Sequence, residues 1–130
     1  MTAFLDTNVI VRHLTADPPA MGARATAYLT TAEVLLLTDV TAAEVVFVLE
    51  SFYEVPRRRV AELVRSVLAF EAVHTLDPAL LGRALEVYEV DRLDFAEAYL
   101  VACAEFSGVD DIASFDRSLD RVRSVTRIEP

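Results

Sequence analysis

The expected fold follows from one stretch near the start of the chain, Ala3-Phe4-Leu5-Asp6-Thr7-Asn8-Val9-Ile10-Val11. A short apolar run, residues 3–5, stops at Asp6, and the apolar residues that follow have helical spacing as far as Leu14. This pattern predicts a strand, a turn that carries a carboxylate, and a short helix. Asp6 is therefore expected at the carboxyl end of the first strand.

The same alternation continues along the chain. Further strands are expected at residues 34–37, 72–75 and 111–114, with an edge strand at 125–128. Helices are expected over about 18–31, 41–54, 57–70, 77–90 and 94–106, with a short helical turn at 116–119. Strands that alternate with helices predict an α/β fold, a three-layer α/β/α arrangement around a central, mostly parallel sheet of four or five strands.

Length and composition favour a single domain over residues 1–130, with 54% hydrophobic residues to build a core. All 12 basic residues are Arg, so lysine-dependent chemistry is excluded: a P-loop, a Schiff base, or the invariant lysine of a phospho-receiver domain. The three glycines are too scattered for a dinucleotide-binding loop. A net charge of −9 argues against a DNA-coating protein, although metal ions held by the acids would let a phosphate approach.

Other residues point to structural roles. The single Cys103 cannot form an internal disulfide and is expected to be a buried small hydrophobe. His13 and His74 have no Ser or Cys partner in a recognisable arrangement, so both are interpreted as structural. No apolar run reaches the roughly 18 residues of a membrane span, and Asp6 and Arg12 interrupt a signal-peptide core. The expected location is the cytoplasm.

Five acidic residues are expected near the carboxyl ends of the strands, where parallel sheets bind ligands. They are Asp6, Glu44, Asp94, Glu97 and Asp116. Carboxylates gathered at one sheet edge repel one another unless a cation lies between them. Hard, oxygen-seeking Mg²⁺ or Mn²⁺ is the expected cation.

Each acid also has a structural interpretation. Thr41-x-x-Glu44 and Asp94-x-x-Glu97 both fit a capping box, and Asp116 could cap its short helix. Asp6 could be a turn residue. Three further acids fit turn or capping roles alone and are assigned no function: Asp17, Asp39 and Asp77.

Four short segments resemble the motifs of PIN-domain nucleases. Phe4-Leu5-Asp6-Thr7-Asn8 resembles the opening D-[ST]-N signature, and Glu44 lies where that family carries a helix-borne acid. Residues 94–98 resemble the D-x-x-D-A segment and residues 114–116 the [TS]-x-D segment. The resemblance covers essentially the whole chain, and the length together with residues 44–59 is most similar to VapC-type toxins of toxin–antitoxin pairs.

One position departs from the family pattern. Glu97 stands where the family usually has aspartate, so the third metal-facing acid is either Glu97 or Asp94. Both are expected on the first turn of one helix, three positions apart and on one face. The sequence does not choose between them.

The resemblance implies a metal-dependent endoribonuclease. Asp6, Asp116 and either Glu97 or Asp94 would hold Mg²⁺ or Mn²⁺, which activates a water for phosphodiester hydrolysis. Glu44 would hold a second ion or orient that water. The implied products carry a 5′-phosphate and a 3′-hydroxyl. The implied partners are RNA, a cognate antitoxin that occludes the acidic cleft, and a second copy in a homodimer.

Two polar side chains are expected to support the acids: Asn8 and Ser114 could hydrogen-bond the carboxylates or the substrate. Arg57-Arg58-Arg59 begins a helix and is a solvated helix start, a phosphate contact or a landing site for an acidic partner.

Two other functions deserve comparison with the same residues. A haloacid-dehalogenase-like phosphatase needs a second aspartate where Asn8 stands and a lysine that the chain lacks. The second alternative is a non-catalytic PIN-like domain that binds RNA or protein without cutting. It remains an alternative because Glu97 departs from the usual aspartate of the family.

Overall fold

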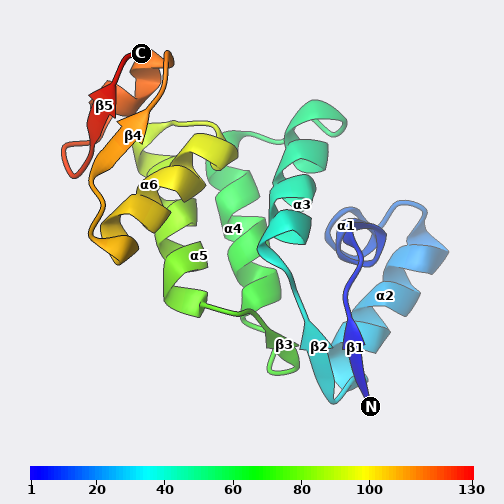
Figure 1. Ribbon diagram of the computed structural model, residues 1–130. Coiled ribbons are helices and arrows are strands. Elements are labelled where there is room, and N and C mark those ends of the chain that lie inside the picture. The colour runs from blue at the N-terminus through cyan, green and yellow to red at the C-terminus, as the bar shows by residue number, and fades with distance from the viewer. The chain divides into compact units, whose positions relative to one another are not determined.

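β1 (Thr2–Phe4), β2 (Val34–Leu36) and β3 (Val73–His74) form a three-stranded parallel sheet in the order β1-β2-β3. The computed structural model describes residues 1–130 (Figure 1). The chain forms two compact units, Met1–Leu76 and Asp77–Pro130, and this sheet belongs to the first. Val34 to Leu37 is a continuous apolar run, as expected for the central strand of a sheet buried on both faces.

The first unit also contains four helices: α1 (Thr7–Thr15), α2 (Pro19–Thr31), α3 (Asp39–Ser51) and α4 (Arg57–Leu68). α1 packs against both α2 and α3, and α3 packs against α4. The core of this unit combines side chains of these helices and of β2: Ile10, Leu35, Leu49 and Val60 are each at most 1% exposed. Each such side chain contributes roughly 1.5–3 kcal/mol by leaving water.

Gly22 lets α2 approach α1 closely. A Cβ atom at this position would lie 2.6 Å from the Ala16 Cα and 2.9 Å from the Arg12 carbonyl oxygen. Both contacts are with backbone, which cannot rotate away as a side chain can. The buried face of α2 is accordingly formed by Gly22, Ala25 and Leu29.

The second unit contains α5 (Pro78–Glu86), a π-helical turn (Val87–Asp91), α6 (Phe95–Ser107), β4 (Asp111–Ala113), a 3₁₀ turn (Arg117–Arg121) and β5 (Thr126–Ile128). β4 and β5 pair in parallel. Asp77 caps α5 by accepting a 3.1 Å hydrogen bond from the Leu80 N–H, as expected. Gly108 ends α6 with φ 75°, a left-handed conformation that glycine adopts without strain.

An ion-pair network ties this unit together. Arg83 on α5 binds Glu105 on α6 through two hydrogen bonds, of 2.7 and 2.9 Å. The Ser124 hydroxyl also donates to Glu105. The Arg83 hydrogen bond is the main cause that lowers the pKa of the Glu105 carboxyl, partly opposed by burial.

The α/β class with parallel strands is confirmed, and every expected helix and strand is present within a few residues. The strands lie in one sheet of three and one sheet of two, where a single sheet of four or five was expected. β2 is hydrogen-bonded to β1 on one side and to β3 on the other, whereas β4 is hydrogen-bonded only to β5.

Two smaller expectations were wrong. α3 begins at Asp39 rather than Thr41, because the Thr38 hydroxyl accepts the Thr41 N–H and so caps the helix two residues earlier. Cys103 is half-buried rather than buried.

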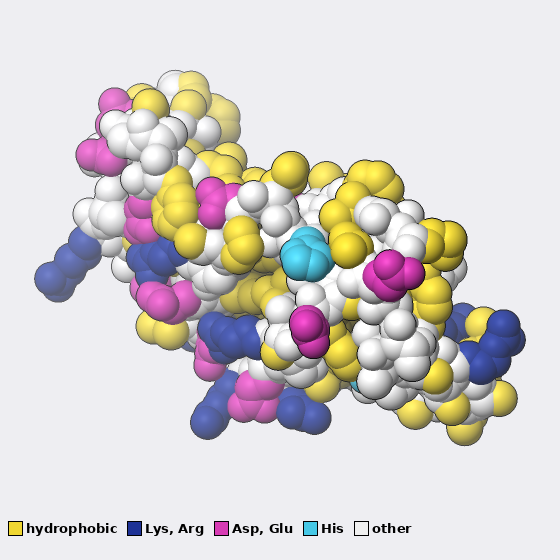
Figure 2. Space-filling model, turned by 90° about the horizontal axis from the view of Figure 1, so that it is seen from below, with side chains coloured by type: hydrophobic (Ala, Val, Ile, Leu, Met, Phe, Trp, Pro, Cys, Tyr) yellow, Lys and Arg dark blue, Asp and Glu magenta, His cyan; other side chains and the backbone are white.

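Some large hydrophobic side chains are exposed, and Figure 2 shows hydrophobic patches interrupted by arginine and acidic side chains. None of the helices has the length and apolar character needed to cross a membrane.

Candidate functional site

Asp6 lies at the carboxyl end of β1 and caps α1. Its Oδ1 accepts a 2.8 Å hydrogen bond from the Thr7 N–H. The bond holds the carboxylate at the N-terminal end of α1, where the helix dipole is positive. The side chain is otherwise exposed, so one of its oxygens is open to a ligand.

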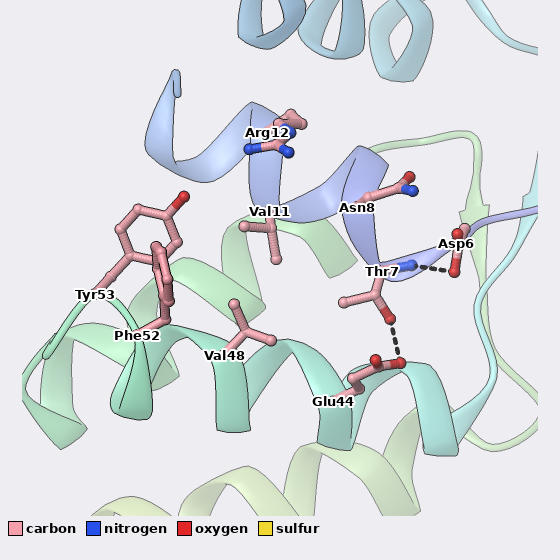
Figure 3. A pocket seen from close by; sticks show the side chains of 9 residues that line it. All are labelled: Asp6, Thr7, Asn8, Val11, Arg12, Glu44, Val48, Phe52 and Tyr53. Carbon is pink, nitrogen blue, oxygen red and sulfur yellow. Dashed lines mark hydrogen bonds between the residues drawn. The ribbon is translucent and has the colours of Figure 1, made fainter. Parts of the chain in front are cut away.

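Glu44 lies in the second turn of α3, and Thr7 forms hydrogen bonds with both Glu44 and Asp6. The Thr7 hydroxyl donates a 2.7 Å hydrogen bond to the Glu44 Oε2. Thr7 is only 8% exposed, so its single hydroxyl proton is well ordered for this bond. The capping box expected for Thr41 and Glu44 is not formed, because the helix begins before Thr41. Thr7 thus connects both acids, one through its backbone and one through its side chain (Figure 3).

The two acids open onto one cavity of about 350 Å³. Nine residues line it, all from α1, α3 and the residues next to them: Asp6, Thr7, Asn8, Val11, Arg12, Glu44, Val48, Phe52 and Tyr53. Figure 3 shows Asn8 beside Asp6, in line with its expected place near the carboxylates. No hydrogen bond links the Asn8 amide to either acid, so its expected support of the carboxylates is not formed here.

The residues at the other end of the cavity were not predicted from the sequence. Arg12 lies one helical turn after Asn8, and Phe52 and Tyr53 follow the end of α3. The spacing of Asn8 and Arg12, four residues apart on one helix, could have indicated that they share a face. An adjacent aromatic pair at a helix end has no periodic pattern that marks it as functional.

The donors in this cavity suit a hard divalent cation. Asp6 and Glu44 both offer carboxylate oxygens, and Mg²⁺ commonly binds through one or two carboxylates together with water and substrate phosphate. The structure contains no group of three or more His, Cys, Asp or Glu side chains arranged to hold a metal ion. A cation bound by this pair would share its coordination with water and substrate.

In the second unit, Asp94 and Glu97 occupy the start of α6. Asp94 is the N-cap residue by position, yet its carboxylate makes no capping hydrogen bond. The capping box is therefore absent, and the interpretation of Asp94 and Glu97 as a capping box is wrong. Asp94 is exposed, whereas Glu97 is half-buried.

Asp116 follows β4 and caps the 3₁₀ turn. Its Oδ1 accepts a 2.9 Å hydrogen bond from the Ser118 N–H. Hydrogen bonding from Ser118, and then the positive charges of Arg121 and Arg127, lower the pKa of the Asp116 carboxyl. Ser114 accepts the Asp116 N–H at 2.9 Å, so Ser114 positions the backbone of Asp116 and not its carboxylate.

These positions divide the expected acids between the units. Asp6 and Glu44 belong to the first, and Asp94, Glu97 and Asp116 to the second. The family model of the PIN domain matches residues 3–125, which include all five acids. The chain belongs to the PIN-domain family. No curated protein matches the chain.

PIN domains are generally nucleases that use divalent metals, so membership supports a hydrolase at a coarse level. The α/β class with parallel strands agrees with the three-layer α/β/α fold of a PIN domain. The carboxylates of Asp6 and Glu44, and the oxygen donors that they provide, agree with that chemistry.

Two other groups of residues have structural partners. Arg58 and Arg59 both pair with Glu62 within α4, which agrees with a solvated helix start. His13 shares a 2.7 Å hydrogen bond with the Thr26 hydroxyl and packs edge-on against Phe70. Burial lowers the pKa of His13, so the neutral form that suits these contacts is favoured.

Proposed function

We propose that this PIN domain is a metal-dependent endoribonuclease that hydrolyses RNA phosphodiester bonds with a metal-activated water. One observation carries the proposal: Thr7 links the carboxylates of Asp6 and Glu44 at the rim of a shared cavity. Two acids from separate helices, held by one buried residue, form a preorganised pair of oxygen ligands.

Asp6 and Glu44 would hold Mg²⁺ or Mn²⁺ in this cavity. The ion, when bound, lowers the pKa of a coordinated water and neutralises charge on the phosphate oxygens. The Thr7 N–H leaves one Asp6 oxygen free, and the Thr7 hydroxyl leaves one Glu44 oxygen free. Those two oxygens are available to bind the ion or to orient the attacking water, while Asn8 can hydrogen-bond the substrate.

Asp94, Glu97 and Asp116 remain in the proposed set of metal-facing acids because of their motif positions. The absence of a capping bond at Asp94 supports keeping it, since its carboxylate has no structural use at the helix start. Ser114 contributes by fixing the loop that presents Asp116.

The proposed biological role is that of a VapC-type toxin in the cytoplasm. Its products would carry a 5′-phosphate and a 3′-hydroxyl. Its partners would be a cognate antitoxin that covers the acidic cavity and a second copy of the chain in a homodimer. These assignments rest on the motif resemblance.

A cleavage assay tests the proposed activity. Purified protein is incubated with 5′-labelled single-stranded RNA in Mg²⁺, in Mn²⁺ and in excess chelator. We expect cleavage with either metal, none with chelator, and loss of cleavage in Asp6→Asn and Glu44→Gln. Glu71→Gln is the matched control, because Glu71 is an exposed acid of the same unit that does not line the cavity. RNA binding without cleavage under every metal condition would favour a non-catalytic binding domain.

A further inference from the structure

The end of the cavity away from the acids combines one cation with two aromatic rings. Arg12 is the single cationic side chain among the lining residues, and Phe52 and Tyr53 lie beside it (Figure 3). Val11 and Val48 form the wall between this end and the carboxylates. We infer that Arg12 and Phe52 form a nucleotide subsite, in which Arg12 binds a phosphate and Phe52 stacks on the base of a nucleotide next to the cleaved bond. The inference rests on the proposed ribonuclease function and deepens it.

Arg12 has hydrogen-bonding capacity that the protein does not use. Its Nη1 donates a 2.7 Å hydrogen bond to the Asp17 carbonyl oxygen, which fixes the side chain. Its Nε is buried and has no hydrogen-bond partner. Its Nη2 makes no hydrogen bond within the protein and is not among the buried atoms, so Nη2 is the donor that a phosphate oxygen can reach.

Phe52 is held in place but left uncovered. The Tyr53 hydroxyl donates a 3.0 Å hydrogen bond to the Asp17 Oδ2, which anchors the Tyr53 ring. The two rings meet edge to face, with centroids 5.0 Å apart and planes at 67°. Phe52 is nevertheless 76% exposed. Exposed aromatic rings beside a cation are the elements with which proteins bind single-stranded nucleic acid, because every base has a face that can stack.

The placement along α1 suits one continuous substrate. Asn8 and Arg12 are separated by four residues, or about 6 Å of helix rise. A strand with one phosphate beside Asn8 would therefore reach Arg12 with its neighbouring nucleotide. A protein partner that covered Phe52 would not explain why Arg12 lines the same cavity as the carboxylates of Asp6 and Glu44, so we favour RNA.

The chain contains no tryptophan, which allows a direct test. Phe52→Trp places a single fluorophore in the subsite. Phe47→Trp is the matched control, because Phe47 is on α3, the helix that ends directly before Phe52, is 67% exposed and does not line the cavity. Each protein is titrated with single-stranded RNA in chelator, so that no cleavage occurs. We expect quenching in Phe52→Trp, none in Phe47→Trp, and none with an abasic oligonucleotide of equal length.

A second measurement tests Arg12. In fluorescence anisotropy with labelled RNA, Arg12→Gln should weaken binding about tenfold and reduce the slope of log K against log salt by about 0.7, the value for one lost phosphate contact on a single strand. Equal quenching at both tryptophan positions, or an unchanged salt slope, overturns the subsite. So does Phe52→Trp fluorescence that depends on protein concentration but not on RNA, which would identify a second copy as the occupant. Cleavage without selective quenching rejects the subsite alone, and selective quenching without cleavage rejects the nuclease alone.

Discussion

The Thr7 hydroxyl donates a 2.7 Å hydrogen bond to Glu44, 37 residues away in sequence. The bond joins the first turn of α1 to the second turn of α3, and the Thr7 N–H simultaneously holds Asp6. The relative position of two candidate metal ligands therefore depends on one side chain that is not itself an acid.

Thr7→Val tests the orientation of Glu44 without changing the charge of either carboxylate. It keeps the shape and the backbone N–H but removes the hydroxyl donor, so the free energy of unfolding should fall by about 0.5–1.5 kcal/mol. Cleavage should fall as well, because Glu44 loses its orientation. Urea denaturation and cleavage rates measure the two effects, and Thr7→Ser should restore both. Wild-type activity in Thr7→Val would show that Glu44 needs no such positioning.

Asp6→Asn is expected to abolish metal-dependent cleavage and leave the fold intact. The amide removes the charge that would bind a cation, but Asn is as good an N-cap as Asp, so α1 keeps its cap. The melting temperature of the metal-free protein should stay the same or rise, because repulsion between carboxylates is relieved. Full nuclease activity of carefully purified Asp6→Asn protein would reject the assignment.

Glu97 and Asp94 can be told apart by metal dependence. If Glu97 is a ligand, its extra methylene should suit the strict octahedral geometry of Mg²⁺ less well than Mn²⁺. We expect faster cleavage in Mn²⁺, a smaller difference in Glu97→Asp, and severe loss in Glu97→Gln. Asp94→Asn should hardly change the melting temperature, since no capping bond is lost. Loss of activity in Asp94→Asn with normal activity in Glu97→Gln would exchange the two roles.

Replacing Arg57, Arg58 and Arg59 together by Gln tests the basic start of α4. Because Arg58 and Arg59 already pair with Glu62, we expect little change in the salt dependence of RNA binding. Binding titrations at several salt concentrations measure the slope. A flatter slope would indicate phosphate contacts, and weaker binding of the proposed antitoxin alone would indicate a partner surface.

Glu105→Gln tests the ion pair with Arg83. The folded-state pKa of Glu105 is lowered, so its stabilisation is present above the ordinary value of 4.5 and is lost as pH falls through the folded-state pKa. At pH 7 the substitution should cost about 1.5–3 kcal/mol, and the difference from wild type should shrink below pH 4.5. Urea denaturation at pH 7, 5 and 3 measures it. Glu62→Gln, which affects only exposed pairs, should cost under about 1 kcal/mol at each pH. A difference that is constant with pH would contradict the linkage.

The order of helices and strands could be predicted because apolar periodicity is a local property. The run at residues 34–37 and the helical spacing after Asp6 correspond to β2 and α1. The start of α3 was placed two residues late, because Thr38 and Thr41 are equally good caps and only the structure shows which hydroxyl accepts an N–H. The division of strands into two sheets depends on pairing between distant segments, which periodicity does not encode.

The candidate site was predicted in part for the same reason. Asp6 and Glu44 stand out as acids beside strand ends, and the structure brings them to one cavity. The role of Thr7 could not be predicted, because its hydrogen bond to Glu44 spans 37 residues and no local sequence pattern indicates it. Phe52 was missed because an exposed aromatic residue after a helix has the same pattern as an ordinary loop residue.

Gly22 has a consequence for this cavity although it does not line it. Any larger residue there would have to push the backbone of α1 at Arg12 and Ala16, because neither contact atom can swing aside. Arg12 shares α1 with Thr7, and a displaced helix would stretch the bond to Glu44. The hydrogen atom at Gly22, where every other amino acid has a carbon atom, therefore helps to keep Thr7 of α1 within hydrogen-bonding distance of Glu44 on α3.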